Sequence, residues 1–236
     1  MKSKAIAHQF EFWEYLGEAG NFFSRDGGYS TISAKGFTWP SRIFDLSSPD
    51  VKLLKQTIQL KGMPHSVAVE DGDKIGKELE KNGFQMRSVV DGMTLLLKPF
   101  MSFSTSRSIH RVSNREEIKL FANIASEAFG YTIYPSSIFG LLGANRVQLF
   151  MGRHKDDYVS CGILYLDCNK DSGLHMIGLK KDYRGLGLGK AMTSHLLHHA
   201  IKNKSEQVHL VASKFGSPIY NKLGFQNRGY LKSYII

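Results

Sequence analysis

The chain has 236 residues, which at roughly 100–200 residues per domain allows one large domain or two small ones. Its hydrophobic content of 42% and charged content of 22% are near the averages of folded proteins, which excludes intrinsic disorder. The longest apolar stretches, such as Met93–Leu97, are far shorter than the ~20 residues of a transmembrane helix, so we expect a cytoplasmic protein without a membrane partner.

The formal charge of +10 is distributed unevenly along the chain. Residues 1–100 have a net charge of +1, whereas residues 101–236 have a net charge of +9. This asymmetry favours a polyanionic partner, which could be nucleic acid, an acidic surface or a phosphorylated cofactor, and charge alone does not choose among them. Two cysteines, Cys161 and Cys168, are too few for a disulfide framework or a structural zinc site, so we expect reduced thiols.

A polar, serine-rich run after Lys98-Pro99-Phe100 has the composition of a linker. It predicts a boundary near residue 100 and two domains, 1–100 and 101–236. The aromatic residues near the start of the chain are expected to form core or inter-domain packing rather than a ligand cage. These residues are Phe10, Phe12, Trp13, Tyr15, Phe22 and Phe23.

The second half has a clear succession of periodic segments. A capping box at Ser113–Glu116 and helical spacing of apolar residues predict a helix over 114–129, and Pro135 is expected to open a short second helix. An antiparallel meander is predicted next, with strands at 147–151, 158–166 and 174–179. The last predicted elements are a helix from Leu188 to about Lys202, a buried strand over 208–211, a short helix over 218–223 and a strand over 230–236.

Two segments of the chain repeat each other. Residues 81–87 match residues 222–228 at an offset of 141, with five of seven positions identical, and the same offset aligns Val67–Val69 with Val208–Leu210. The surrounding pattern of strand, helix, Gly-Phe and strand agrees in both places. We therefore predict two copies of one fold.

The segment from Leu179 to Lys190 is rich in glycine and lies between a predicted strand and a predicted helix, where backbone N–H groups and the helix dipole attract an anion. It is not a Walker loop, because Gly185 lies too close to Gly189 and Lys190 is followed by Ala191. It also fits a dinucleotide fingerprint poorly, because its glycines are spaced one residue too tightly. A plain strand-to-helix turn remains an alternative.

Arg184-Gly185-Leu186-Gly187-Leu188-Gly189 follows the pattern R-x-x-G-x-G, and here the chain resembles the GNAT superfamily of acetyl-CoA-dependent acetyltransferases. The resemblance implies that acetyl-CoA is the acyl donor, that Arg184 and the N–H groups of residues 185–190 hold its pyrophosphate, and that the backbone of Leu179 polarises the thioester carbonyl. The implied cofactor-binding residues are Leu179, Lys181, Arg184, Gly185, Leu186, Gly187, Leu188, Gly189, Lys190 and Ser213.

A second segment, Tyr220-Asn221-Lys222-Leu223-Gly224-Phe225, resembles the later Tyr-x-x-Leu-Gly-Phe signature of that family. The resemblance implies that Tyr220 protonates the departing thiolate, although a partly buried core tyrosine is the alternative. Ser213 stands where many members have an asparagine, which leaves that contact open. In the first copy, Leu79 aligns with Tyr220 and no glycine loop is present, so residues 1–100 resemble a degenerate copy.

The fold implied is α/β (α+β), with two GNAT-like domains, each a mixed, mostly antiparallel sheet flanked by helices. A charged amine acceptor must lose a proton before it attacks, and His175 is the titratable side chain on the strand before the glycine loop, while Asp167 with a water chain is an alternative base. No metal is expected, because Leu196 stands where a zinc-binding helix containing His195 and His199 would need Glu.

The function predicted is transfer of an acetyl group from acetyl-CoA to an amine acceptor, either a small molecule or a peptide, by direct attack. The alternative is a module that senses an acyl-CoA or binds nucleic acid without catalysis. Basic and aromatic residues do not interleave as a base-stacking surface requires, which disfavours nucleic acid. The sequence leaves the acceptor, the acyl-chain length and the oligomeric state open.

Overall fold

The computed structural model describes residues 3–26, 28–34, 36–72 and 74–236. The chain divides into two compact units, of which the first combines Met1–Met93 with Val211–Ile236 and the second is Thr94–Leu210. The chain passes between the units inside strands β5 (Gln85–Leu96) and β10 (Gln207–Ala212). None of the described helices is both long enough and apolar enough to cross a bilayer.

The first unit has a mixed sheet in the order β1-β2-β3-β4-β11-β5. Strand β3 is parallel to β4, whereas β1 with β2, β2 with β3, and β4 with β11 are antiparallel. Besides β5, the elements are α1 (Lys4–Ala19), β1 (Phe23–Asp26), β2 (Tyr29–Ser33), β3 (Ser41–Phe44), α2 (Val51–Lys61), β4 (Ser66–Glu70), α3 (Lys74–Lys81), α6 (Ser217–Lys222) and β11 (Gln226–Ile235).

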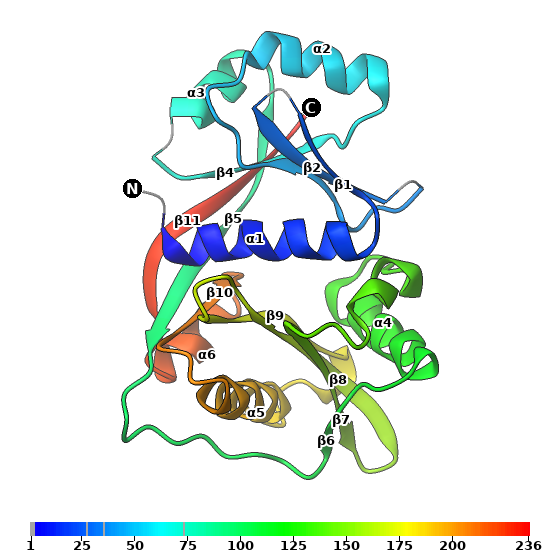
Figure 1. Ribbon diagram of the computed structural model, residues 1–236, viewed down its shortest axis with the longest axis vertical. Coiled ribbons are helices and arrows are strands. Elements are labelled where there is room, and N and C mark those ends of the chain that lie inside the picture. Colours follow the sequence, from blue (N-terminus) through cyan, green and yellow to red (C-terminus); the bar gives the residue numbers. More distant parts are fainter. Residues whose placement is uncertain (1–2, 27, 35, 73) are drawn as a thin grey trace. The chain divides into compact units, whose positions relative to one another are not determined.

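Helices cover both faces of this sheet (Figure 1). Ile43 packs in a core with residues of α2 and α3, while its neighbour Phe44 faces α1 and lies 5.2 Å, ring to ring, from Trp13. Phe10, Phe12 and Trp13 are buried, so this part of the aromatic opening is core, as predicted. Tyr15, Phe22 and Phe23 are half-buried.

The last strand of the chain belongs to the first unit. Strand β11 pairs with β4 from Leu231 opposite Glu70 to Ile235 opposite Ser66, and in sheet order it lies between β4 and β5. Residues Val67–Val69 of β4 are fully buried, so their backbone N–H and C=O groups need partners, which β3 and β11 provide on the two edges. The compact units therefore do not coincide with the ranges 1–100 and 101–236, and that pair of domains stays a prediction.

The second unit has the sheet order β10-β9-β8-β7-β6, in which β9 and β10 are parallel and the other pairs are antiparallel. Its elements before β10 are β6 (Ile109–Arg111), α4 (Arg115–Phe129), two 3-10 turns (Pro135–Ser137 and Phe139–Leu141), β7 (Val147–His154), β8 (Asp157–Leu166), β9 (Ser172–Leu179), a 3-10 turn (Lys181–Tyr183) and α5 (Leu188–Lys202).

Helices α4 and α5 cover opposite faces of β8 and β9. A Cβ atom built at Gly162 would lie 3.0 Å from Leu196 of α5, whereas the adjacent Cys161 faces the other side, where Gly178 approaches Ala128 of α4. Buried residues of both helices complete the core, namely Ile118, Phe121, Ala122, Ala125, Met192, Leu196, Leu197 and Ala200.

Apart from the helix predicted after Pro135, the elements predicted for the second half are found in the predicted order with shifted ends, and β6 is an additional strand. The helix cap is one residue later than predicted: Asn114 Oδ1 accepts a hydrogen bond from the Glu117 amide over 2.9 Å, and the Glu117 carboxylate accepts one from the Ser113 amide over 2.7 Å. Pro135 opens a pair of 3-10 turns instead of an α-helix.

Candidate active site

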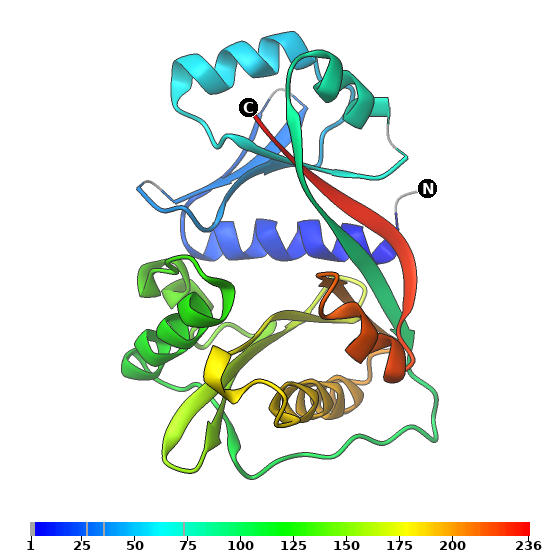
Figure 2. The ribbon, with the colours of Figure 1, turned by 180° about the vertical axis from the view of Figure 1, so that it is seen from behind.

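The glycine-rich loop connects β9 to α5, and Figure 2 shows it in yellow at the start of that helix. Gly185 and Gly187 have φ angles of +82° and +77°, in the left-handed region that favours glycine. A Cβ atom at Gly185, Gly187 or Gly189 would meet no atom within 4 Å. The loop is therefore open on the side of its α-carbons, which is the approach that a ligand would need.

The backbone amides of this loop differ in whether a described protein group accepts their hydrogen bonds. The Arg184 amide donates to the Lys181 carbonyl over 3.2 Å, and the Ala191 amide donates to the Gly187 carbonyl over 3.0 Å. Among the residues that the structure describes, none accepts a hydrogen bond from the intervening amides, residues 185–190. The first-turn amides of a helix lack intrahelical partners, and here the preceding loop extends that set.

Two side chains fasten the loop to the end of α4. Arg184 Nη2 donates to the Ala128 carbonyl oxygen over 3.1 Å, and Lys180 Nζ lies 3.7 Å from the Glu127 carboxylate. Lys181 and Lys190 are exposed, so their ammonium groups remain in solvent beside the loop. The arginine of the motif thus has a structural contact in addition to any contact with an anion.

A turn between β7 and β8 supports the loop from another direction. Tyr183 Oη donates to Asp157 Oδ2 over 2.8 Å, and this hydrogen bond raises the pKa of the tyrosine. The His154 ring lies edge-on to the Tyr183 ring, with 5.8 Å between centroids. Sequence reasoning missed these contacts, because nothing in the local pattern links residue 157 to residue 183.

Strand β9 carries a bulge shortly before it ends at Leu179. Cys161 pairs with Gly178 while Ile163 pairs with His175, so two residues of β9 stand opposite one residue of β8. Met176, within the bulge, has a φ angle of +50°, and its carbonyl oxygen accepts a hydrogen bond from Cys161 Sγ over 3.5 Å. The bulge sets the direction in which the end of the strand leaves the sheet.

His175 lies just before this bulge and is buried, with 5% of its surface exposed. Its ring is edge-on to Tyr165, 6.2 Å between centroids. His175 and the glycine loop thus belong to one strand–loop–helix segment of the second unit, separated by the bulge and the 3-10 turn.

Tyr220 and Ser213 are residues of the first unit. Tyr220 lies in α6 and is half-buried, with its ring edge-on to Phe225 at 5.8 Å; burial raises the pKa of its hydroxyl to about 12. Ser213 is exposed, and its hydroxyl accepts a hydrogen bond from the Gly216 amide over 3.3 Å. Ser213 therefore caps the turn that leads into α6.

The histidines of α5 are engaged with protein groups. His195 Nδ1 accepts a hydrogen bond from the Ser106 amide over 3.4 Å, and His198 Nδ1 lies 3.3 Å from the Phe103 carbonyl oxygen. In the part of the chain that the structure describes, no three His, Cys, Asp or Glu residues are grouped as metal ligands.

Comparison with known proteins found a matching family model and solved structures of similar fold. The family model described as an acetyltransferase (GNAT) domain matches residues 111–232, just over half of the chain. A search of curated proteins found no match. Among solved structures, a GCN5-related N-acetyltransferase from Kribbella flavida is similar in fold, with a TM-score of 0.74 and 12% identity over 100% of this chain and 96% of that one.

A second similar structure is a GCN5-related N-acetyltransferase from Sphaerobacter thermophilus, with a TM-score of 0.62 and 13% identity over 88% of this chain and 76% of that one. Identities this low establish a common fold only. The family match covers the meander, the glycine loop and the Tyr220 segment. The chain belongs to the GNAT family of acetyltransferases.

Proposed function

We propose that the protein is an N-acetyltransferase that binds acetyl-CoA along its glycine loop and transfers the acetyl group directly to an amine. The observation that carries this proposal is the run of six adjacent backbone amides, residues 185–190, without an acceptor among the described residues. A diphosphate offers oxygens that match such a row of donors at a helix N-terminus.

The residues around the loop fit this ligand. Glycines at 185, 187 and 189 leave space for phosphate oxygens to approach the main chain. Lys181 and Lys190 are exposed beside the loop and supply positive charge, while Arg184 holds the loop against α4. The excess positive charge of residues 101–236 acts in the same direction at longer range.

In the proposed reaction, the neutral amine nitrogen attacks the thioester carbonyl carbon, the carbon–sulfur bond breaks, and coenzyme A leaves as a thiol. The Leu179 amide, at the end of β9, is the proposed donor to the carbonyl oxygen, and positioning supplies much of the rate. Tyr220 is the proposed donor of the proton that the thiolate takes up; burial raises the pKa of its hydroxyl to about 12, so the hydroxyl carries its proton at neutral pH.

The proton lost by the amine requires a base. We propose His175 for this role, with Asp167 and a water chain as the alternative. Because His175 is buried, the reaction would need a path for the proton between the acceptor and the imidazole. Replacing His175 with Asn should then lower turnover most near neutral pH and least at alkaline pH, where the amine is already neutral, whereas a purely structural role predicts a loss of stability without a changed pH profile.

We also propose that the first half derives from a second copy of the fold that has lost its cofactor site. The element order of strand, helix and strand is the same in β4-α3-β5 and in β10-α6-β11. Leu79, which aligns with Tyr220, is fully buried, and residues 41–44, near where the glycine loop would be expected, form strand β3. Neither feature leaves a phosphate site or a proton donor there.

Calorimetric titration with acetyl-CoA tests the proposal first. A panel of polyamines, amino acids, aminoglycosides and peptides, scored by release of free thiol from acetyl-CoA, then identifies the acceptor. Tyr220→Phe should retain coenzyme binding and lose turnover, while Tyr230→Phe, at an exposed tyrosine of β11, should keep both. A protein that shows no heat of binding with acetyl-CoA would not be an acetyltransferase.

A further inference from the structure

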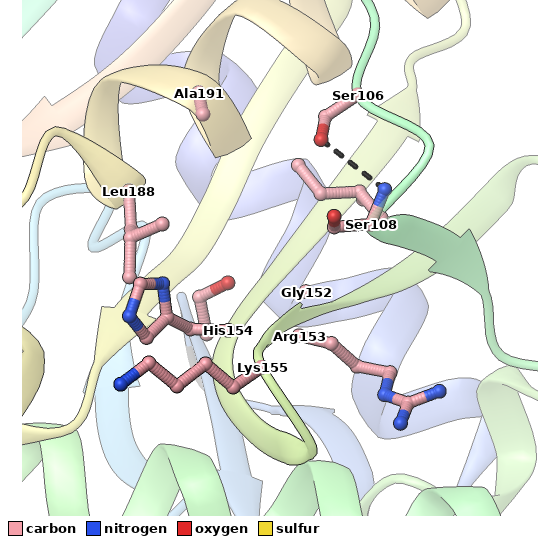
Figure 3. Close-up of a pocket in the computed structure, with 10 residues that line it drawn as sticks. Ser106, Ser108, Gly152, Arg153, His154, Lys155, Leu188 and Ala191 are labelled. Carbon is pink, nitrogen blue, oxygen red and sulfur yellow. Dashed lines mark hydrogen bonds between the residues drawn. The ribbon is translucent and has the colours of Figure 1, made fainter.

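The second unit has a cavity of about 150 Å³ on the side of α5 that faces the sheet (Figure 3). Its walls come from the segment before β6, the β7–β8 hairpin and the first turn of α5, where Leu188 and Ala191 line it. Apart from Leu188, no residue of the glycine loop lines it, so the cavity is a separate feature of this unit.

The floor of the cavity contains a buried hydroxyl. Ser160, on β8, lines the cavity and is only 3% exposed, and none of the described residues makes a hydrogen bond with its Oγ atom. A Cβ atom at Gly152 would lie 2.4 Å from that oxygen, so the glycine makes room for it. The Ser160 hydroxyl opens into the cavity, so a ligand or a water molecule there can take its hydrogen bond.

The rim of the cavity is basic. In Figure 3 the side chains of His154 and Lys155 extend on the same side as Leu188, whereas Arg153 points away. Arg153 Nη2 lies 3.8 Å from Asp156 Oδ1, and Asp157 accepts a hydrogen bond from the Tyr183 hydroxyl. Both carboxylates of this turn therefore have partners other than Lys155. Lys155 is exposed and forms no ion pair with any residue in the described part of the chain.

Hydroxyl groups complete the polar lining. Ser106 and Ser108 come from the segment before β6, and Ser106 Oγ accepts a hydrogen bond from the Ser108 amide over 3.2 Å, drawn as the dashed line in Figure 3. The first turn of α5 adds the positive end of a helix dipole. Hydroxyl donors, an unpaired lysine and a helix N-terminus together suit an anion with several oxygens.

We propose that this cavity binds a phosphoryl group. A cavity of about 150 Å³ accommodates a molecule the size of benzene, so it has room for a phosphoryl group but not for a nucleoside. Two molecules could supply this phosphoryl group, and the experiment below distinguishes them. One is the 3′-phosphate of a coenzyme A bound at the glycine loop, which rests on the proposed function; the other is free inorganic phosphate.

The test uses the full chain and two variants, Ser160→Ala and Lys155→Met. Lys170→Met is the matched control, because Lys170 is also an exposed lysine with positive φ in a hairpin turn, at +67° against +54° for Lys155. Each protein is titrated calorimetrically with inorganic phosphate, with acetyl-CoA and with 3′-dephospho-acetyl-CoA. Circular dichroism and thermal unfolding establish that each variant is folded, and the exposed Lys155 provides a variant that leaves the core intact.

If the coenzyme is the source, both variants should bind acetyl-CoA about tenfold more weakly than the parent and bind the dephospho analogue equally well. If free phosphate is the source, the variants should lose affinity for phosphate about tenfold and keep their coenzyme affinity. If both variants bind each of the three ligands as tightly as the parent does, the proposal is wrong. A chain that does not bind acetyl-CoA refutes the proposed function, yet the phosphate titration still decides on the cavity.

Discussion

Arg184 Nη2 donates a hydrogen bond to the carbonyl oxygen of Ala128 across 3.1 Å, and thereby ties the glycine loop to the last turn of α4. A guanidinium at the C-terminal end of a helix satisfies a carbonyl that has no intrahelical partner and interacts well with the helix dipole. The contact gives this arginine a role in shaping the loop before any anion binds.

Replacing Arg184 with Ala should weaken acetyl-CoA binding by at least about tenfold, because both a loop anchor and a positive charge are lost. Arg184→Lys should recover part of the affinity, since lysine keeps the charge but loses the fixed geometry. Calorimetry measures both effects. Arg87→Ala removes an exposed arginine of β5 as the control and should bind normally. Unchanged affinity in Arg184→Ala would contradict the role of the loop.

Gly187→Ala separates backbone strain from loss of the ligand site. Gly187 has a φ angle of +77° at the start of α5, and Gly62 has +61° at the end of α2; a Cβ atom added at either glycine would meet no atom within 4 Å. Each alanine variant should lose about 1–2 kcal/mol of unfolding free energy from the left-handed conformation alone.

Only the variant at residue 187 should also lose affinity for acetyl-CoA, because only there would the new methyl group stand where phosphate oxygens approach. Urea titration gives the stability and calorimetry the affinity. If Gly62→Ala weakened coenzyme binding as much as Gly187→Ala does, the effect would come from stability and not from the loop.

Local signals predicted the elements that carry the site, since the glycine spacing between a β-rich run and an amphipathic helix is sufficient to place β9, the loop and α5. Long-range relationships were not predictable in the same way. The pairing of β11 with β4 joins residues more than 150 positions apart, and a strand pattern does not specify its partner. Consequently the linker composition after Lys98 suggested a division of the chain that the compact units do not follow.

The bulge in β9 was also not predicted from the sequence. Met176 adopts a positive φ angle although methionine has no preference for that region, so the conformation comes from its surroundings, including the Cys161 thiol that bonds its carbonyl. The cap of α4 was misplaced by one residue for a similar reason: Ser113 and Asn114 are both good caps, and only the packed helix decides between them.

The two cysteines should differ in reactivity. Burial raises the pKa of Cys161 to about 12, and its thiol is engaged with Met176, whereas Cys168 is exposed. At pH 8 the folded protein should therefore react with one equivalent of Ellman's reagent, and the second equivalent should react only in denaturant. Cys168→Ser should leave no fast-reacting thiol, and two fast thiols in the native protein would show that the bulge opens.

His195 should make the stability of the protein fall at acidic pH. Burial lowers the pKa of its imidazole to about 4, and the nearby His199, His198 and Lys202 act in the same direction. Between pH 6.5 and 4 the unfolded chain takes up a proton at this residue that the folded chain does not. The contribution of His195 to the free energy of unfolding is thus fully present above pH 6.5. It is lost as the pH falls, by at most about 1.4 kcal/mol per pH unit.

Urea unfolding at pH 7, 6 and 5 measures this slope. His195→Gln should be less stable at pH 7, because the partly buried contact with the Ser106 amide is altered, but its stability should fall less steeply with acid than that of the parent. His65→Gln, at an exposed histidine of the first unit, is the control for the histidine-to-glutamine exchange itself. If His195→Gln kept the full slope, the acid sensitivity would arise at other groups, of which His199 is the first to examine because burial also lowers its pKa.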